Sequence, residues 1–223
     1  MKIRGPAFLT ATLATGQTIG LVRTFVVARF LGPEVQGEAV ALGLITGFFA
    51  ATLTMNSSWQ LVQSRREDIA NFQSSLQGAA IARGLFTSIL MATLGTFILR
   101  YISQESLAPA LYAISLVPFI EGFIHLDPWR SLRDDRFKTL AIFQIFGPFG
   151  AAISAAVTLL FIQDIWVIVI VMLSTSAFRV AGSHLVATHA WKAKIHATHI
   201  REIIRFGLPL IPVSYTHLRA HET

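Results

Sequence analysis

Residues 139–162 read TLAIFQIFGPFGAAISAAVTLLFI, a run of 24 residues without an aspartate, glutamate, lysine or arginine. A helix rises about 1.5 Å per residue, so about 20 apolar residues cross the hydrocarbon core of a bilayer, which is about 30 Å thick. A helix on the surface of a soluble protein instead shows a polar side that returns about every 3.6 residues. Because this stretch is long enough and has no such side, it predicts a transmembrane helix.

Five further charge-poor stretches extend this pattern over most of the chain. The longest runs from residue 39 to residue 64, which is 26 residues without a charged side chain. Hydrophobic residues make up 53% of the chain and charged residues 13%, whereas a typical soluble domain has about 25% charged residues. These values exclude a disordered chain and argue against a soluble enzyme. We therefore predict an all-α, polytopic transmembrane helix bundle, with helices at residues 6–28, 37–57, 79–100, 106–126, 139–162 and 165–189.

The end of the chain has a different character. Residues 203–214, IIRFGLPLIPVS, predict the start of a seventh helix, although this run is too short to cross a bilayer. Residues 215–223 then change abruptly and resemble a translated adapter sequence, the alternative being a genuine short polar tail. The expected organisation is a six-helix membrane lobe at residues 1–205, the start of a seventh helix at 206–214 and a non-native-looking tail at 215–223.

Lysine and arginine are distributed unevenly between the two sides of the predicted bundle. Of the 18, only Arg29 and Arg100 fall in the loops opposite the N-terminus. Because positive residues accumulate in cytoplasmic loops, we expect a cytoplasmic N-terminus, and the net charge of +6 reflects topology rather than nucleic-acid binding. Twelve fall on the N-terminal side: Lys2, Arg4, Arg65, Arg66, Arg130, Arg133, Arg136, Lys138, Lys192, Lys194, Arg201 and Arg205.

Three ionisable side chains, Arg23, Glu121 and Arg179, fall inside predicted helices, where a charge costs roughly 2.5–3.5 kcal/mol to insert. Counting residues from the helix ends places Glu121 and Arg179 at similar depth, so these two can pair. One interpretation is an ion pair that holds the helices together. Another is a cationic cavity for a lipid-linked sugar pyrophosphate, because the planar arginine fork binds phosphate oxygens with two hydrogen bonds. A third is snorkelling to the membrane surface, which we also expect of Arg83 in the first turn of its predicted helix.

Other side chains give weaker signals. Gln17 offers hydrogen bonds either to sugar hydroxyls or to a neighbouring helix. Without cysteine or an HExxH spacing, we expect the histidines on the cytoplasmic side to contact lipid headgroups rather than a metal. No Walker loop, GxGxxG or nucleophile elbow occurs, so we expect no cofactor, no catalytic residue and no enzyme activity. These histidines are His125, His184, His189, His196 and His199.

Residues 28–37, ARFLGPEVQG, resemble the end of the first helix in a known family. Arg83-Gly84-Leu85, the basic loop that ends at Arg136-Phe137-Lys138, and FGLP at 206–209 extend the similarity. Together they resemble the oligosaccharide and polysaccharide flippases, the Wzx-type polysaccharide biosynthesis membrane proteins, whose superfamily includes multidrug and toxin extruders. The resemblance covers about residues 1–214 and implies the first lobe of a two-lobe transporter, so the chain is expected to be an N-terminal fragment.

The resemblance also implies a function. Such a protein flips a lipid-linked oligosaccharide, a polyprenyl-pyrophosphate glycan, across the bacterial cytoplasmic (inner) membrane for surface polysaccharide such as lipopolysaccharide. The expected partners are membrane lipids, a polysaccharide polymerase and glycosyltransferases. The expected substrate-binding residues are Arg23, Arg179, Glu121, Gln17 and Arg29, the last of which belongs to the motif that carries the resemblance.

Two alternatives stay open. An ion-coupled multidrug exporter of the same superfamily would use acidic residues deep in the lobe, and Glu121 is the one such residue. A membrane-embedded glycan polymerase or acyltransferase would need reactive residues in a large outer loop, whereas the predicted outer loops are short.

Overall fold

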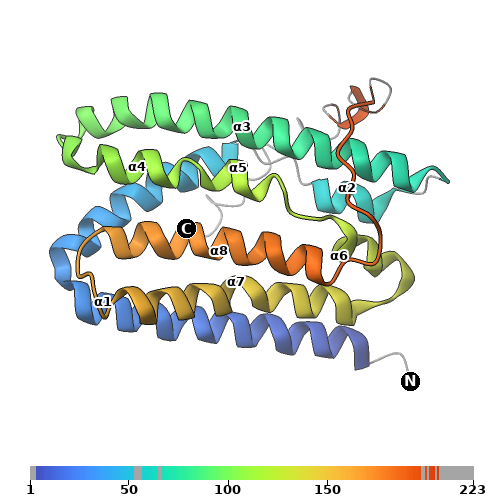
Figure 1. Ribbon diagram of the computed structural model, residues 1–223, viewed down its shortest axis with the longest axis horizontal. Helices are drawn as coiled ribbons and strands as arrows, with labels where there is room; N and C mark the ends of the chain where they lie inside the picture. Colours follow the sequence, from blue (N-terminus) through green and yellow to red (C-terminus); the bar gives the residue numbers. More distant parts are fainter. Residues whose placement is uncertain are drawn as a thin grey trace, which may run out of the picture.

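The part of the chain that the computed structural model describes is helical, with no strand in it. It comprises residues 4–52, 57–64, 67–196, 199, 201–203 and 205. The long helices lie side by side along one axis, and the chain runs back and forth between the two ends of the bundle (Figure 1). The elements are α1 (Arg4–Thr52), α2 (Ser57–Gln63), α3 (Ile69–Tyr101), η1 (Glu105–Leu107), α4 (Ala108–Ile114), α5 (Val117–Glu121), α6 (Asp127–Arg130), η2 (Ser131–Asp134), α7 (Phe137–Thr158) and α8 (Trp166–Leu185).

Helix α1 bends at Gly32, where the backbone angles are φ 75° and ψ 175°. This conformation is open almost exclusively to glycine. Pro33 follows at the start of the second half, where its missing N–H costs little. The bend turns the chain back toward the opposite end of the bundle (Figure 1). The turn predicted between the helices at 6–28 and 37–57 was therefore too long, because a single glycine replaces it, and the second predicted helix extends five residues beyond the end of α1 at Thr52.

The single helix predicted over residues 106–126 is wrong. The chain forms α4 and α5 there, with a turn at Ser115 and Leu116, and α5 ends at Glu121. Pro118 lies in the first turn of α5. Because proline lacks an N–H and its ring clashes with the carbonyl four residues earlier, here that of Ile114, a continuous helix is interrupted at this point.

Other boundaries differ less. Helix α3 begins at Ile69 rather than at residue 79, because polar side chains such as Gln73 and Gln77 are buried against protein instead of forming a surface loop. Helices α7 and α8 replace the predictions at 139–162 and 165–189 with ends shifted by one to four residues. The predicted start of a seventh helix at 206–214 and the tail at 215–223 lie outside the described residues.

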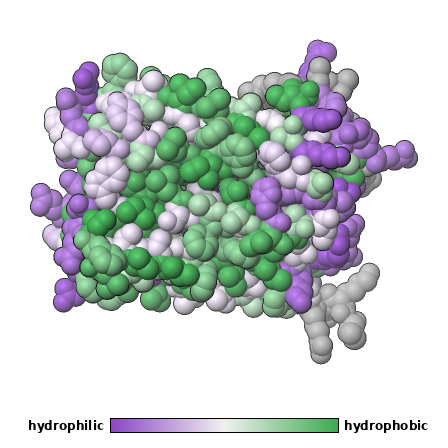
Figure 2. Space-filling model, viewed as in Figure 1, coloured by the Kyte–Doolittle hydropathy of each residue, from purple (hydrophilic) through white to green (hydrophobic). Residues whose placement is uncertain are grey.

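In the described part of the chain, three helices, α3, α7 and α8, are long and apolar enough to cross a membrane by length and composition. On the face shown in Figure 2, apolar side chains form a broad band across the bundle, and hydrophilic ones gather at both ends. Large exposed apolar side chains include Phe25 at 74% and Phe161 at 81% exposure, and apolar surface of this extent marks a lipid or protein contact. The chain is therefore a membrane protein by these features, while the predicted count of six spans is not confirmed.

Helices α7 and α8 pack closely through two glycines. Phe178 of α8 lies directly over Gly150 of α7, and Phe146 of α7 lies directly over Gly182 of α8. A methyl group at either glycine would collide with the facing ring. This reciprocal arrangement fixes the register between the two helices, and it therefore fixes the height at which α8 presents its polar side chains.

Candidate functional site

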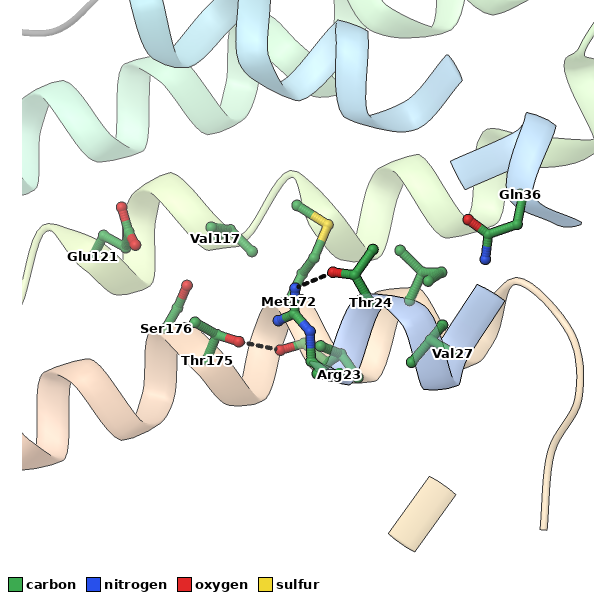
Figure 3. Close-up of a pocket in the computed structure, with 11 residues that line it drawn as sticks. Arg23, Thr24, Val27, Gln36, Val117, Glu121, Met172, Thr175 and Ser176 are labelled. Carbon is green, nitrogen blue, oxygen red and sulfur yellow. Dashed lines mark hydrogen bonds between the residues drawn. The ribbon is translucent and has the colours of Figure 1, made fainter. Parts of the chain in front are cut away.

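A cavity of about 400 Å³ lies between α1, α5 and α8 (Figure 3). Its polar lining comes from Arg23, Thr24 and Gln36 of α1, Glu121 of α5, and Thr175 and Ser176 of α8. Aliphatic side chains and a methionine form most of the rest. The cavity thus places a cation, an anion and several hydroxyl groups inside a helix bundle.

Two more cavities share lining residues with the first. One of about 270 Å³, between α1, α7 and α8, shares Arg23 and Thr175 with it. Another of about 310 Å³, between the second half of α1, α3, α4, α5 and α8, shares Glu121. We call the three together the inner crevice. Its polar and charged lining residues are Gln17, Arg23, Thr24, Gln36, Thr46, Arg83, Thr87, Glu121, Gln144, Thr175, Ser176 and Arg179.

An ion pair joins α8 to α5 across the inner crevice. Arg179 Nη1 donates a hydrogen bond to Glu121 Oε1 at 2.5 Å, and the two side chains are 35% and 33% exposed. Gly147 of α7 makes room for the arginine stem, since a Cβ there would lie 2.9 Å from Arg179 Cγ. The pairing predicted from helix depth is therefore confirmed. Whether either residue contacts a substrate stays a prediction.

Arg23 lies where the first two cavities meet. Its Nη2 is 3.4 Å from the Thr24 hydroxyl (Figure 3). Among the residues that the structure describes, no carboxylate forms an ion pair with Arg23. Because a guanidinium keeps its proton in proteins and carries five N–H donors, Arg23 is a permanent positive charge with donors available to the crevice.

The structure places the two other predicted site residues, Gln17 and Arg29, in different surroundings. Gln17 lines the second cavity beside Arg23 and Arg179. Arg29 is exposed and lines none of the three cavities. It lies six residues beyond Arg23, about 9 Å along α1, close to the bend at Gly32, and the structure therefore does not bring it together with the other four.

Arg83 lines the third cavity with Glu121, whereas the sequence indicated a role at the membrane surface. The sequence placed Arg83 in the first turn of its predicted helix, whereas α3 starts at Ile69. Arg83 therefore lies fourteen residues, or about 21 Å, from the start of the helix. The charged residues that line the described crevice are thus three arginines (Arg23, Arg83 and Arg179) and one glutamate. Its formal charge is +2.

A second polar cluster surrounds Asp127 of α6, at the end of the bundle where the N-terminus lies (Figure 1). Asp127 Oδ2 accepts hydrogen bonds from the Thr188 N–H at 2.7 Å and the Thr188 hydroxyl at 3.0 Å, and Oδ1 lies 2.7 Å from His189 Nδ1. Burial alone would raise the pKa of this carboxyl, but the hydrogen bonds from Thr188 and His189 hold the pKa below its ordinary value. We call this arrangement the Asp127 clamp, because it fastens the segment after α8 to α6.

Besides His189 in the Asp127 clamp, His125, His184 and His199 also make protein contacts, and His184 Nε2 lies 3.0 Å from the Phe123 carbonyl oxygen. Burial lowers the pKa of His125, whose Nδ1 accepts the Asp127 backbone N–H at 3.0 Å. His199 Nδ1 lies 3.0 Å from the Ser75 hydroxyl. Within the described ranges, no group of three or more histidine, cysteine, aspartate or glutamate side chains is placed to hold a metal ion. The expected contact of these histidines with headgroups stays a prediction.

A comparison with known proteins bears on this arrangement. The family model described as polysaccharide biosynthesis protein matches residues 26–222. No match was found among curated proteins or among solved structures. The family match includes α8 and all of α1 beyond residue 25, so it takes in most of the residues that line the inner crevice.

Proposed function

The chain belongs to the polysaccharide biosynthesis protein family, and from that premise we propose that it is a transporter lobe that flips a lipid-linked oligosaccharide across a membrane. The substrate class is a polyprenyl-pyrophosphate glycan, destined for surface polysaccharide such as lipopolysaccharide. The proposed membrane is the bacterial cytoplasmic membrane, with the N-terminus on the cytoplasmic side. The uneven distribution of lysine and arginine supports this orientation.

The observation that carries the proposal is Arg23. It lines two cavities of the inner crevice without a carboxylate partner among the described residues. A charge inside a membrane protein is costly and is usually paired or exposed to a watery cavity. A pyrophosphate would supply the missing anion, and arginine binds phosphate oxygens through two parallel hydrogen bonds.

The Glu121–Arg179 pair gives the crevice a second, exchangeable cation. Each side chain is about one-third exposed, so water and a substrate reach the pair. In the proposed cycle the pyrophosphate replaces Glu121 as the partner of Arg179, and Glu121 takes Arg179 back when the substrate leaves. The exchange would couple substrate binding to the contact between α5 and α8.

The rest of the crevice suits a glycan. The individual cavities, at about 400, 270 and 310 Å³, are near or within the range of small-molecule sites, about 300–1,000 Å³. Gln17 and Gln144 offer amide groups, which can both donate to and accept from sugar hydroxyls. We propose transport without enzyme activity, with polysaccharide polymerase and glycosyltransferases acting before and after it.

An ion-coupled multidrug exporter is the rival function. It would use Glu121 to exchange an ion or a cationic drug. In the structure Glu121 is engaged by Arg179, and the charges that line the described crevice sum to +2, which opposes cationic drugs. Drug-sensitivity assays on cells that lack the gene separate the two functions. Only the exporter hypothesis predicts that these cells become hypersensitive to drugs.

The test of the flippase is complementation of a deletion strain with Arg23→Gln, Arg23→Lys and Arg29→Gln. Arg29 is the matched control, because it is an arginine on the same helix that lies outside the crevice. We expect Arg23→Gln to abolish surface polysaccharide, Arg23→Lys to retain part of it, and Arg29→Gln to retain most of it at equal protein levels. Normal polysaccharide from Arg23→Gln would refute the role of Arg23.

A further inference from the structure

A fourth cavity, of about 170 Å³, lies at the polar end of the bundle and shares no lining residue with the inner crevice. It is formed by the first turns of α3, by α6 and by the segment after α8. Its polar lining consists of Gln73, Ser74, Gln77, Arg130, His189 and Lys192. We call it the end pocket.

A directed chain of hydrogen bonds runs along one wall of the end pocket. Arg130 Nη1 donates to Gln73 Oε1 at 3.2 Å, and Gln73 Nε2 donates to Gln77 Oε1 at 3.3 Å. The direction is fixed because arginine has donors and no acceptor. Gln73 must therefore present its oxygen to Arg130, and Gln77 must present its oxygen to Gln73.

The chain ends on a donor without an acceptor. Gln77 is 1% exposed, and its Nε2 has no hydrogen-bond partner among the residues that the structure describes. A buried polar group that lacks a partner costs about 1–3 kcal/mol, so such groups mark stored strain or a place where a water, an ion or a ligand binds. Since Gln77 lines the end pocket, a ligand that bonds this amide N–H must present a hydrogen-bond acceptor.

The charges around the end pocket specify that acceptor further. Among the described residues that line it, the two permanently charged ones are Arg130 and Lys192, and both are cations. Asp127 does not line it, and both carboxylate oxygens of Asp127 are engaged by Thr188 and His189. The donors come from α3, α6 and the segment after α8, so they reach the pocket from three elements rather than from one plane.

We propose that the end pocket binds a phosphate group, held by Arg130, Lys192 and the side-chain amide of Gln77. A tetrahedral phosphate offers oxygens to donors on several sides, whereas a carboxylate offers two oxygens in one plane. One water occupies about 30 Å³ of liquid, so 170 Å³ accommodates a phosphate group and excludes an oligosaccharide. The phosphate comes either from an anionic lipid headgroup or from a free phosphate in solution.

A bound phosphate would join the segment after α8 to α3. That segment already contacts α3 through the Lys194 N–H, which donates to the Ser74 carbonyl at 3.0 Å, and through Gly78, where a Cβ would meet the Lys194 carbonyl oxygen at 3.0 Å. Phosphate would add a bridge from Lys192 to Gln77 beside these contacts. Occupancy of the pocket would therefore stabilise the end of the bundle.

The test measures binding of two probes to the purified full chain in neutral detergent by calorimetric titration. The probes are inorganic phosphate and dihexanoyl phosphatidic acid, with acetate as the carboxylate comparator. The variants are Lys192→Gln, which changes an exposed side chain, and Gln77→Leu. The matched control is Lys194→Gln, which removes the same charge two residues away from an exposed position outside the pocket.

We expect saturable one-to-one binding that Lys192→Gln and Gln77→Leu each weaken about tenfold or more, as for loss of a hydrogen bond to a charged group, with Lys194→Gln within about twofold of wild type. Binding of phosphatidic acid alone would assign the site to a lipid headgroup, and binding of both probes would assign it to free phosphate as well. Absence of saturable binding, equal losses in Lys192→Gln and Lys194→Gln, or equally tight binding of acetate would overturn the proposal. If Gln77→Leu fails to fold, the comparison of the two lysine variants still decides.

Discussion

The Glu121–Arg179 ion pair allows the clearest test of the packing between α5 and α8. Glu121→Gln removes the carboxylate, keeps the shape of the side chain and leaves the guanidinium of Arg179 without its anion. Breaking a fully buried pair costs about 3–5 kcal/mol, whereas an exposed pair contributes about 0.2–1 kcal/mol. With the two side chains 33% and 35% exposed, we expect the loss of unfolding free energy to fall between these limits, at about 1–3 kcal/mol.

The assay is a double-mutant cycle of Glu121→Gln, Arg179→Gln and the double variant, followed by unfolding in detergent. The double variant should recover part of the loss, which gives a coupling free energy of about 1–2 kcal/mol. The chain provides a control pair in Asp134 and Arg136, which lie 2.9 Å apart with side chains 57% and 48% exposed. Its coupling should stay below about 0.5 kcal/mol. A Glu121–Arg179 coupling no larger than that of the control pair would refute the reasoning.

Three further predictions concern single positions. Gly32→Ala should destabilise the protein by about 1–3 kcal/mol, because its φ of 75° and ψ of 175° strain any other residue. The control is Gly37→Ala, which lies in a helical position with open space around a Cβ and should be neutral or stabilising in the same unfolding measurement. Gly150→Leu should lower the unfolding free energy by about 1–3 kcal/mol or more through collision with Phe178, and an unchanged midpoint would contradict the reciprocal packing of α7 and α8. Because the pKa of Asp127 is lower in the folded protein than its ordinary value of about 3.9, its contribution to stability is present above that value and is lost as the pH falls through the folded-state pKa. Asp127→Asn should therefore lower stability near neutral pH and flatten the acid limb of a stability–pH profile, and a profile parallel to that of wild type would count against the Asp127 clamp.

Features that depend on local composition could be predicted from the sequence. A long charge-free run indicated α7, and a charge-poor run interrupted only by Arg179 indicated α8, because burial in lipid disfavours charged side chains. The similar depth of Glu121 and Arg179 followed from counting the rise per residue, and their ion pair was one of three interpretations that this depth allowed. The family resemblance rested on residues 28–37, and the match over residues 26–222 confirms it at the level of the family.

Features that depend on contacts between distant segments were missed. The start of α3 was predicted ten residues too late, because polar side chains such as Gln73 and Gln77 do not indicate a membrane helix, although Arg130, 57 residues after Gln73, gives Gln73 a partner inside the protein. Because the predicted start of α3 was too late, Arg83 was also expected at the membrane surface rather than in the inner crevice. Arg29 was grouped with the site because it belongs to the motif at residues 28–37, whereas the residues that line the cavities share a helix face and a depth in the bundle.

Binding of polyprenyl pyrophosphate tests the central claim most directly. The purified protein and its Arg23→Gln variant are compared for binding of polyprenyl pyrophosphate and of the matching polyprenol, which lacks the phosphates. We predict that wild type prefers the pyrophosphate by at least about tenfold, as expected when a charge-assisted contact is gained, and that Arg23→Gln loses most of this preference. Equal affinity of wild type for the two lipids, or an unchanged preference in Arg23→Gln, would contradict the claim that the inner crevice is a pyrophosphate site.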